Sequence, residues 1–247
     1  LKNYGFMANF KIVNGAYIRI NAFKNNQDGY RENKFFNLKN TNNKDESFFN
    51  LKFKFKPNQK FSFYNTVILS ELDNGYDSWA PDNNKDYRTY TDQPGKDSQK
   101  TKAFSSKLEY KQDKWSLVGK VSGTLSNLIH SYDGDWGNNA FWEDSTTYGY
   151  EPYYDGYSYQ FFDETFRQRK TYTAEGRLVA RKNIIGFYIK TLQEEDDAVG
   201  WLFGGDAAQA NSYYNMKIKA VYAQTELNLN EKISSTTSIR FENNEIL

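Results

Sequence analysis

The sequence predicts an all-β fold of about ten antiparallel up-and-down strands, and three observations support this prediction. Apolar and polar residues alternate with a period of two in almost every segment between turn signals, which is typical of strands with two different faces. Helical spacing is hard to find. Short and long connections alternate along the chain, as expected for hairpins whose long loops all lie at one end of a sheet.

The first hairpin shows the pattern most clearly. Alternate residues of its first strand share an apolar face: Tyr4, Phe6, Ala8, Phe10 and Ile12. Asn14-Gly15 follows, and both residue types tolerate the positive φ angles of a type I′ turn. The apolar face continues in the returning strand at Ile18 and Ile20. The unit recurs four times, with turns at Pro57-Asn58, Gln112-Asp113-Lys114, Lys182-Asn183 and Asn230-Glu231.

In the fifth hairpin the alternation is less regular. Met216, Ile218, Ala220 and Tyr222 read as its apolar face, which places Lys217 and Lys219 on the polar face. The parity changes between Tyr222 and Leu227, so we expect a β-bulge there.

Four long polar connections separate the hairpins, at residues 27–44, 72–100, 133–166 and 192–210. Compact soluble domains rarely carry several loops of this length, whereas bacterial outer-membrane barrels combine tight turns at one end with long loops at the other. The longest segments reach the roughly 9 to 11 residues that a transmembrane strand needs. The sequence therefore predicts part of a large transmembrane β-barrel, with lysines such as Lys52, Lys54 and Lys120 facing a water-filled lumen.

Composition limits the other possibilities. The chain has no cysteine, which excludes disulfides and thiolate metal sites, and its 32 basic and 31 acidic residues give no reason to expect a nucleic-acid partner. No apolar run is long enough for a transmembrane helix. His130 is the only histidine, and neither a nucleophile elbow nor a phosphate-binding glycine loop accompanies it. We therefore expect neither an enzyme nor a cofactor.

The long loops are rich in aromatic residues with amide and acidic neighbours. Such residues stack on the rings of a ligand and fix its orientation, although packing of the loops against one another is the competing interpretation. Our candidate substrate-binding residues are Tyr76, Trp79, Tyr87, Tyr90, Trp136, Trp142, Tyr153, Tyr154, Tyr157 and Trp201.

Two loop segments offer oxygen atoms around a glycine, as a calcium loop would: Asp73-Asn74-Gly75-Tyr76-Asp77 and Asp133-Gly134-Asp135. Neither has the full spacing of a calcium loop, and ordinary turn chemistry accounts for both. The acidic run at residues 194–197 is typical of a solvated loop tip. We assign no metal ligand.

Several sequence segments resemble the barrel hairpins of TonB-dependent outer-membrane receptors. They are residues 25–33, 41–46, 72–79, 92–97 and 131–136. The resemblance implies a 22-stranded bacterial outer-membrane barrel with an N-terminal plug, which imports a scarce solute such as a siderophore or glycan with energy delivered by TonB. Membrane lipid on the outer face, a small solute and the TonB complex would be the partners. No plug-like segment occurs in this sequence, so we expect residues 1–247 to be a partial barrel domain that is incomplete at both ends.

A secreted or surface β-sheet module that binds or cleaves carbohydrate is the alternative. The barrel and the carbohydrate module differ in what contacts the apolar strand faces. In the barrel, Phe6, Phe10, Phe53, Leu117, Phe187 and Ile218 meet lipid, and in the module they meet a second sheet.

Overall fold

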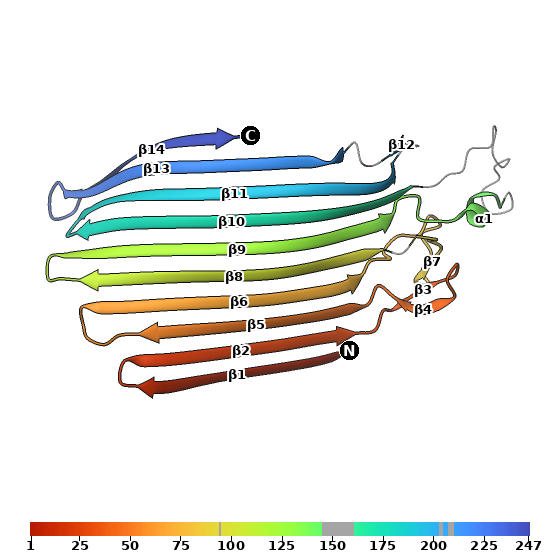
Figure 1. The fold of residues 1–247 in the computed structure, drawn as a ribbon, viewed down its shortest axis with the longest axis horizontal. Helices are drawn as coiled ribbons and strands as arrows, with labels where there is room; N and C mark the ends of the chain where they lie inside the picture. The colour runs from red at the N-terminus through yellow and green to blue at the C-terminus, as the bar shows by residue number, and fades with distance from the viewer. Residues whose placement is uncertain (94, 145–160, 203–204, 207–209) are drawn as a thin grey trace.

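The computed structural model describes residues 1–93, 95–144, 161–202, 205–206 and 210–247. Ten long strands form one antiparallel sheet, and each pairs with the long strand before it and the one after it along the chain (Figure 1). They are β1 (Lys2–Val13), β2 (Ala16–Gln27), β5 (Lys44–Phe55), β6 (Phe61–Gly75), β8 (Lys96–Lys111), β9 (Trp115–Asp133), β10 (Phe162–Ala180), β11 (Asn183–Leu202), β13 (Ser212–Asn228) and β14 (Ser234–Ile246). The predicted up-and-down arrangement is confirmed.

Short turns lie at one end of this sheet and the long connections lie at the other, as predicted (Figure 1). The connections carry small elements of their own. β3 (Arg31–Asn33), β4 (Leu38–Thr41) and β7 (Arg88–Thr89) form a separate three-stranded sheet, β12 (Gly205–Asp206) pairs with β11, and α1 spans Asn139–Trp142. No helix in the described parts of the chain is long and apolar enough to cross a membrane.

The strands extend further toward the loop end than the sequence pattern indicated. β8 already begins at Lys96, β10 begins at Phe162 and β11 continues to Leu202, so parts of three predicted connections are strand. Polar and charged runs at residues 96–100 and 193–197 interrupt the alternation of apolar and polar residues in this region, which removes the period-two signal. Backbone pairing between the strands of each hairpin nevertheless continues, because it depends on the main chain and not on the side chains.

Asn14-Gly15 forms the predicted hairpin turn, but only Gly15 has a positive φ, at 82°. A type I′ turn requires positive φ at both central residues, so the predicted turn type was wrong. Gly15 also lies directly against the neighbouring hairpin: a Cβ atom here would be 2.1 Å from the Lys56 carbonyl oxygen. The glycine is therefore required by its backbone conformation and by a close approach to the next strand.

The expected bulge in β13 is absent, and the assignment of its faces was wrong. Pairing runs without a register shift from Met216 to Asn228. Phe187 pairs with Val221, and paired residues share a face, so Lys217 and Lys219 lie on the same face as Phe187 while Ile218 lies on the opposite face. Apolar residues occupy both faces of β13, and the sequence pattern assigned the apolar face to the even-numbered residues, which lie on the opposite face.

The sheet has no hydrophobic core. Among the described residues only Ala16, Val118, Ala198 and Ala220 are both apolar and buried. The large apolar side chains remain exposed instead, with Phe6 at 60% and Phe187 at 47% of their full accessibility. No second sheet covers them in the described parts of the chain, so the layered packing that a carbohydrate-binding sandwich requires is not present.

Candidate functional site

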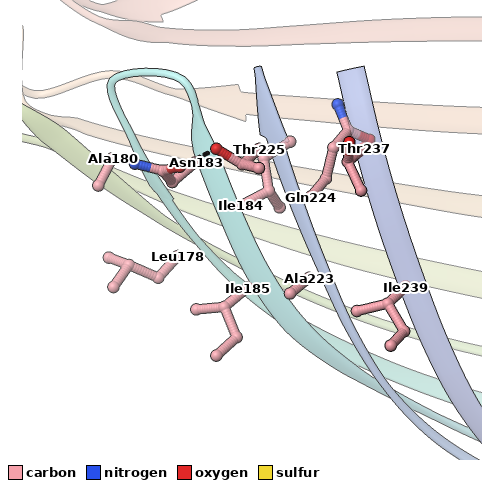
Figure 2. Close-up of a pocket in the computed structure, with 10 residues that line it drawn as sticks. All are labelled: Leu178, Ala180, Asn183, Ile184, Ile185, Ala223, Gln224, Thr225, Thr237 and Ile239. Carbon is pink, nitrogen blue, oxygen red and sulfur yellow. Dashed lines mark hydrogen bonds between the residues drawn. The ribbon is translucent and has the colours of Figure 1, made fainter. Parts of the chain in front are cut away.

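One face of the sheet, here called the apolar face, carries apolar side chains in register across many strands. Leu117, Leu178, Ile185, Ala223 and Ile239 pair successively from β9 to β14 and therefore form one row. The last four line a shallow depression of about 370 Å³ near the short turns (Figure 2). Soluble proteins rarely leave an apolar surface of this extent open to water, so this face requires an apolar environment.

The uncharged part of the apolar face extends a similar distance from the short turns on most strands. On nine of the ten long strands, its first charged side chain lies about ten residues from the short turn, which is the length of a strand that crosses a bilayer obliquely. On β9 this face carries no charged residue before Asp133. The first charged residues are Lys2, Lys24, Asp45, Glu71, Lys102, Lys170, Glu195, Lys219 and Glu245. The band below them is free of charge on this face, as the lipid-facing band of a barrel must be.

The opposite face, here called the polar face, holds charged and hydroxyl side chains at the same heights. The hydroxyls of Ser122 and Thr173 lie 2.6 Å apart across β9 and β10, and Tyr222 donates a hydrogen bond to Glu175 at 2.7 Å. Lys54 and Lys107 lie over the Tyr64 ring at 5.9 and 5.6 Å from its centroid. Such a network is stable where water or other polar groups contact it, as in the lumen of a wide barrel.

At the loop end, a buried carboxylate joins the first two long connections. The Asp77 carboxylate accepts hydrogen bonds from the Thr89 hydroxyl at 2.7 Å, from the Thr91 hydroxyl at 3.2 Å and from the Asn33 amide at 3.3 Å. All four residues are buried. Because Asn33 belongs to residues 28–43 and the others to residues 76–95, this cluster holds the two connections together. We call it the Asp77 cluster.

A second buried cluster joins the connection after β6 to the connection after β9. Asp133 accepts hydrogen bonds from the backbone N–H groups of Asp92 at 3.0 Å and Asp135 at 3.1 Å. Asp135 accepts hydrogen bonds from the backbone N–H of Phe161 at 2.9 Å and from the Trp142 indole at 3.2 Å. The carboxylate oxygens therefore serve as turn and loop acceptors, as ordinary turn chemistry predicts.

The same arrangement changes the acidity of Asp133, which ends β9 beyond the apolar band. Burial raises the pKa of Asp133 to about 7, and the neighbouring Asp135 carboxylate acts in the same direction, while the Asp92 N–H opposes the change. No group of three or more His, Cys, Asp or Glu side chains in the described ranges is placed to hold a metal ion.

Six candidate aromatic residues lie in this joined loop region. The Trp79 and Trp136 rings stack with centroids 5.8 Å apart and an interplanar angle of 24°, although they come from different connections. The Trp79 indole donates to the Tyr76 hydroxyl at 3.3 Å. Trp79 and Trp136 remain 54% and 40% exposed. They form an aromatic surface open to a ligand, here called the tryptophan pair.

Trp136 adopts a backbone conformation that bulky residues seldom use. Its φ angle is 63°, in the left-handed region. The turn is held by the Asp133 carboxylate, which accepts a hydrogen bond from the Trp136 N–H at 3.2 Å. Strained backbone of this kind is concentrated at functional sites, and here it presents the indole to solvent beside Trp79.

The other candidate residues differ in their surroundings. Tyr87 is exposed and forms an edge contact with Tyr30, while Tyr90 packs on Phe141 and donates to Asp82. The Trp142 indole donates its hydrogen bond to Asp135, so Trp142 is better described as part of the loop packing. Trp201 lies in β11. Tyr153, Tyr154 and Tyr157 lie outside the described residues.

Sequence reasoning missed the partners that position these rings. Tyr30 and Phe141 were not selected, and neither was Asn33, because single aromatic and amide residues in a polar loop carry no periodic signal. Asp77 was noted only as an oxygen donor in a turn. Its burial depends on Thr89 and Thr91, more than ten residues away in the same connection, and on Asn33 in the connection before it.

Sequence comparison gives no relatives: no protein-family model matches the chain, and no curated protein matches it. Comparison with solved structures gives several matches in fold. The ferric yersiniabactin uptake receptor FyuA from Yersinia pestis superposes with a TM-score of 0.71 at 13% identity, over 99% of this chain and 37% of that receptor. The closed form of the ferric-catecholate import receptor Fiu from E. coli K12 gives 0.67 at 13% identity, over 99% of this chain and 39% of Fiu.

The siderophore receptor PiuA from Acinetobacter baumannii gives a TM-score of 0.61 at 9% identity, over 99% of this chain and 44% of PiuA. The chain thus spans well under half the length of the receptors it matches, and identities this low establish the fold alone. Taken with the open ten-stranded sheet, its uncovered apolar face and its one-sided loops, these matches show that the chain has the fold of a section of the β-barrel wall of TonB-dependent outer-membrane receptors.

Proposed function

We propose that this chain forms part of the wall and the external loops of a bacterial outer-membrane receptor that captures a small solute for uptake. The uncharged band on the apolar face carries this proposal, because it is about ten residues high on nine strands and nothing in the described sheet covers it. Lipid would cover this face, and the charged polar face would line the lumen.

The tryptophan pair is the proposed capture surface. Two nearly parallel indoles at the loop end present flat, apolar area to a ligand, and the Tyr76 hydroxyl beside them offers a polar contact. Flat or ring-shaped groups, such as the aromatic rings of a siderophore or the sugar rings of a glycan, are the ligand features that such a surface binds. Of the matched receptors, FyuA is a ferric yersiniabactin uptake receptor, Fiu is a ferric-catecholate import receptor and PiuA is a siderophore receptor, which favours a siderophore as the first ligand to test.

Uptake through such a barrel would need a plug and contact with the TonB complex. Neither is part of the ten strands described here, and we propose both as partners by analogy with the receptors that share this fold. The role we assign is binding and transport, with no catalytic step.

The test is solute binding by the full-length protein that contains these residues, purified in detergent and titrated with a ferric catecholate siderophore and, separately, with a linear oligosaccharide. Trp79→Ala removes half of the tryptophan pair at an exposed position and should weaken binding about tenfold. Trp115→Ala is the matched control, because Trp115 is also an exposed tryptophan, at 40%, and lies at the short-turn end of the sheet. Equal binding by the wild type and Trp79→Ala would exclude the tryptophan pair as the capture surface.

A further inference from the structure

Three lysines stand at the upper border of the apolar face on strands that are close together. Lys102 on β8 pairs with Leu125 on β9, and Leu125 pairs with Lys170 on β10, so both lysines share a face and flank one leucine. Their backbones are two strand spacings apart, or roughly 10 Å. Lys219 on β13 is the corresponding first charged residue two strands further along. We call Lys102, Lys170 and Lys219 the lysine row.

No ion pair among the described residues involves Lys102, Lys170 or Lys219. Two lysines further toward the loops on β8 and on the same face are neutralised: Lys100 pairs with Glu71 at 2.7 Å and Lys96 with Asp73 at 3.2 Å. The charge of the lysine row is therefore available to an external anion.

Aromatic rings lie immediately below the lysine row. Phe104 and Tyr172 sit on either side of Gly123, and they are 48% and 54% exposed. A Cβ atom at Gly123 would be 2.5 Å from the Phe104 ring, so the glycine allows both rings to close over the strand between them. From the short turns upward, this part of the surface is apolar, then aromatic, then cationic. Acyl chains, the membrane interface and charged headgroups follow one another in the same order.

We propose that the lysine row binds the phosphate groups of lipid headgroups in the leaflet that surrounds the loop end of the barrel. The inference rests on the proposed membrane location and adds a specific ligand for the outer surface. Ammonium groups bind phosphate as point charges, and the adjoining apolar face supplies contact for the acyl chains of the same lipid. A free phosphate ion would gain only the first of these contacts, so the site favours a phosphorylated lipid over a soluble anion.

The test compares two double variants of the full-length protein with the same change in charge. Lys102→Gln with Lys170→Gln removes two members of the lysine row, and Lys120→Gln with Lys190→Gln removes two lysines of the polar face. Each protein is purified in non-ionic detergent and titrated with a diphosphorylated glucosamine lipid and with its dephosphorylated form. Loss of two interfacial lysines should weaken binding of the phosphorylated lipid about thirty-fold, and the control should bind as the wild type does.

Three results would overturn the inference: equal binding of the phosphorylated lipid by the wild type and the lysine-row variant, equal loss in the control variant, or competition by inorganic phosphate at concentrations similar to those of the lipid. Insertion into vesicles separates this inference from the proposed function. A protein that inserts, yet binds both forms of the lipid equally, contradicts the lysine row alone. Failure of the wild-type protein to insert contradicts both proposals.

Discussion

Replacing Val121 with arginine places a charge in the middle of the apolar face. Val121 is 46% exposed and pairs with Ser106 and Ala174 on its two neighbouring strands, so the substitution removes little packing within the protein. If lipid covers this face, the arginine must be accommodated near the bilayer midplane, at a cost of about 2 to 4 kcal/mol in the free energy of unfolding. If water covers it, the cost is that of an ordinary surface change, within about 0.5 kcal/mol.

The matched control is Asn127→Arg, on the same strand and the same face but beyond the uncharged band. Asn127 is exposed and accepts only a 3.2 Å hydrogen bond from Gln168. Near the interface an arginine costs about 0 to 1 kcal/mol. The assay is reversible unfolding of the full-length protein in lipid vesicles by guanidinium chloride, with the folded fraction followed by tryptophan fluorescence and by gel mobility without heating. Equal destabilisation by the two substitutions would refute a lipid-facing surface.

Three further predictions concern the turns and loops. Asp77→Ala leaves two buried threonine hydroxyls and the Asn33 amide without their acceptor. The loss should cost about 1 to 3 kcal/mol of local stability and accelerate proteolysis of residues 76–95. Unchanged cleavage would contradict the role of the Asp77 cluster. Gly15→Ala forces a positive φ on alanine and a Cβ against the Lys56 carbonyl, and should lower stability by more than about 1 kcal/mol in the same unfolding assay. Because the pKa of Asp133 is raised in the folded protein to about 7, the loop cluster gains stability from its protonated form below about pH 4 and loses that contribution as the pH rises through about 7. Proteolysis of the loops should therefore be slower at pH 5.5 than at pH 8, and Asp133→Asn should reduce the difference.

Much of the architecture could be predicted from the residues alone. Period-two alternation in Tyr4 to Ile12 and its repeats identifies strands because successive side chains of a strand point to opposite faces, and Asn14-Gly15 identifies a turn because glycine tolerates positive φ. Strict alternation of short and long connections then gives the up-and-down order and places all long loops at one end. These are local properties, so the sequence carries them directly.

Where both faces of a strand carry similar residues, the local signal fails. Met216, Ile218 and Ala220 formed a convincing apolar series, yet pairing with β11 places Lys217 and Lys219 on the apolar face. The sequence pattern predicts connections at the loop-end parts of β8, β10 and β11, because polar and charged residues interrupt the alternation there. In both cases the register with neighbouring strands decides, and a single strand does not contain that information.

Alternation and turn chemistry are properties of neighbouring residues, so they predict a run of antiparallel hairpins with aromatic loops at one end. Which aromatic residues meet depends instead on contacts between separate loops. Trp79 and Trp136 are stacked because the Asp133 carboxylate at the end of β9 binds the backbone N–H groups of Asp92 and Trp136, which joins the connections after β6 and β9. Likewise, Lys102 and Lys170 flank one leucine only because β8 and β10 pair with β9 in a particular register. Contacts between residues far apart in the chain depend on closing loops whose conformations no local pattern encodes, and these contacts form the proposed binding surfaces.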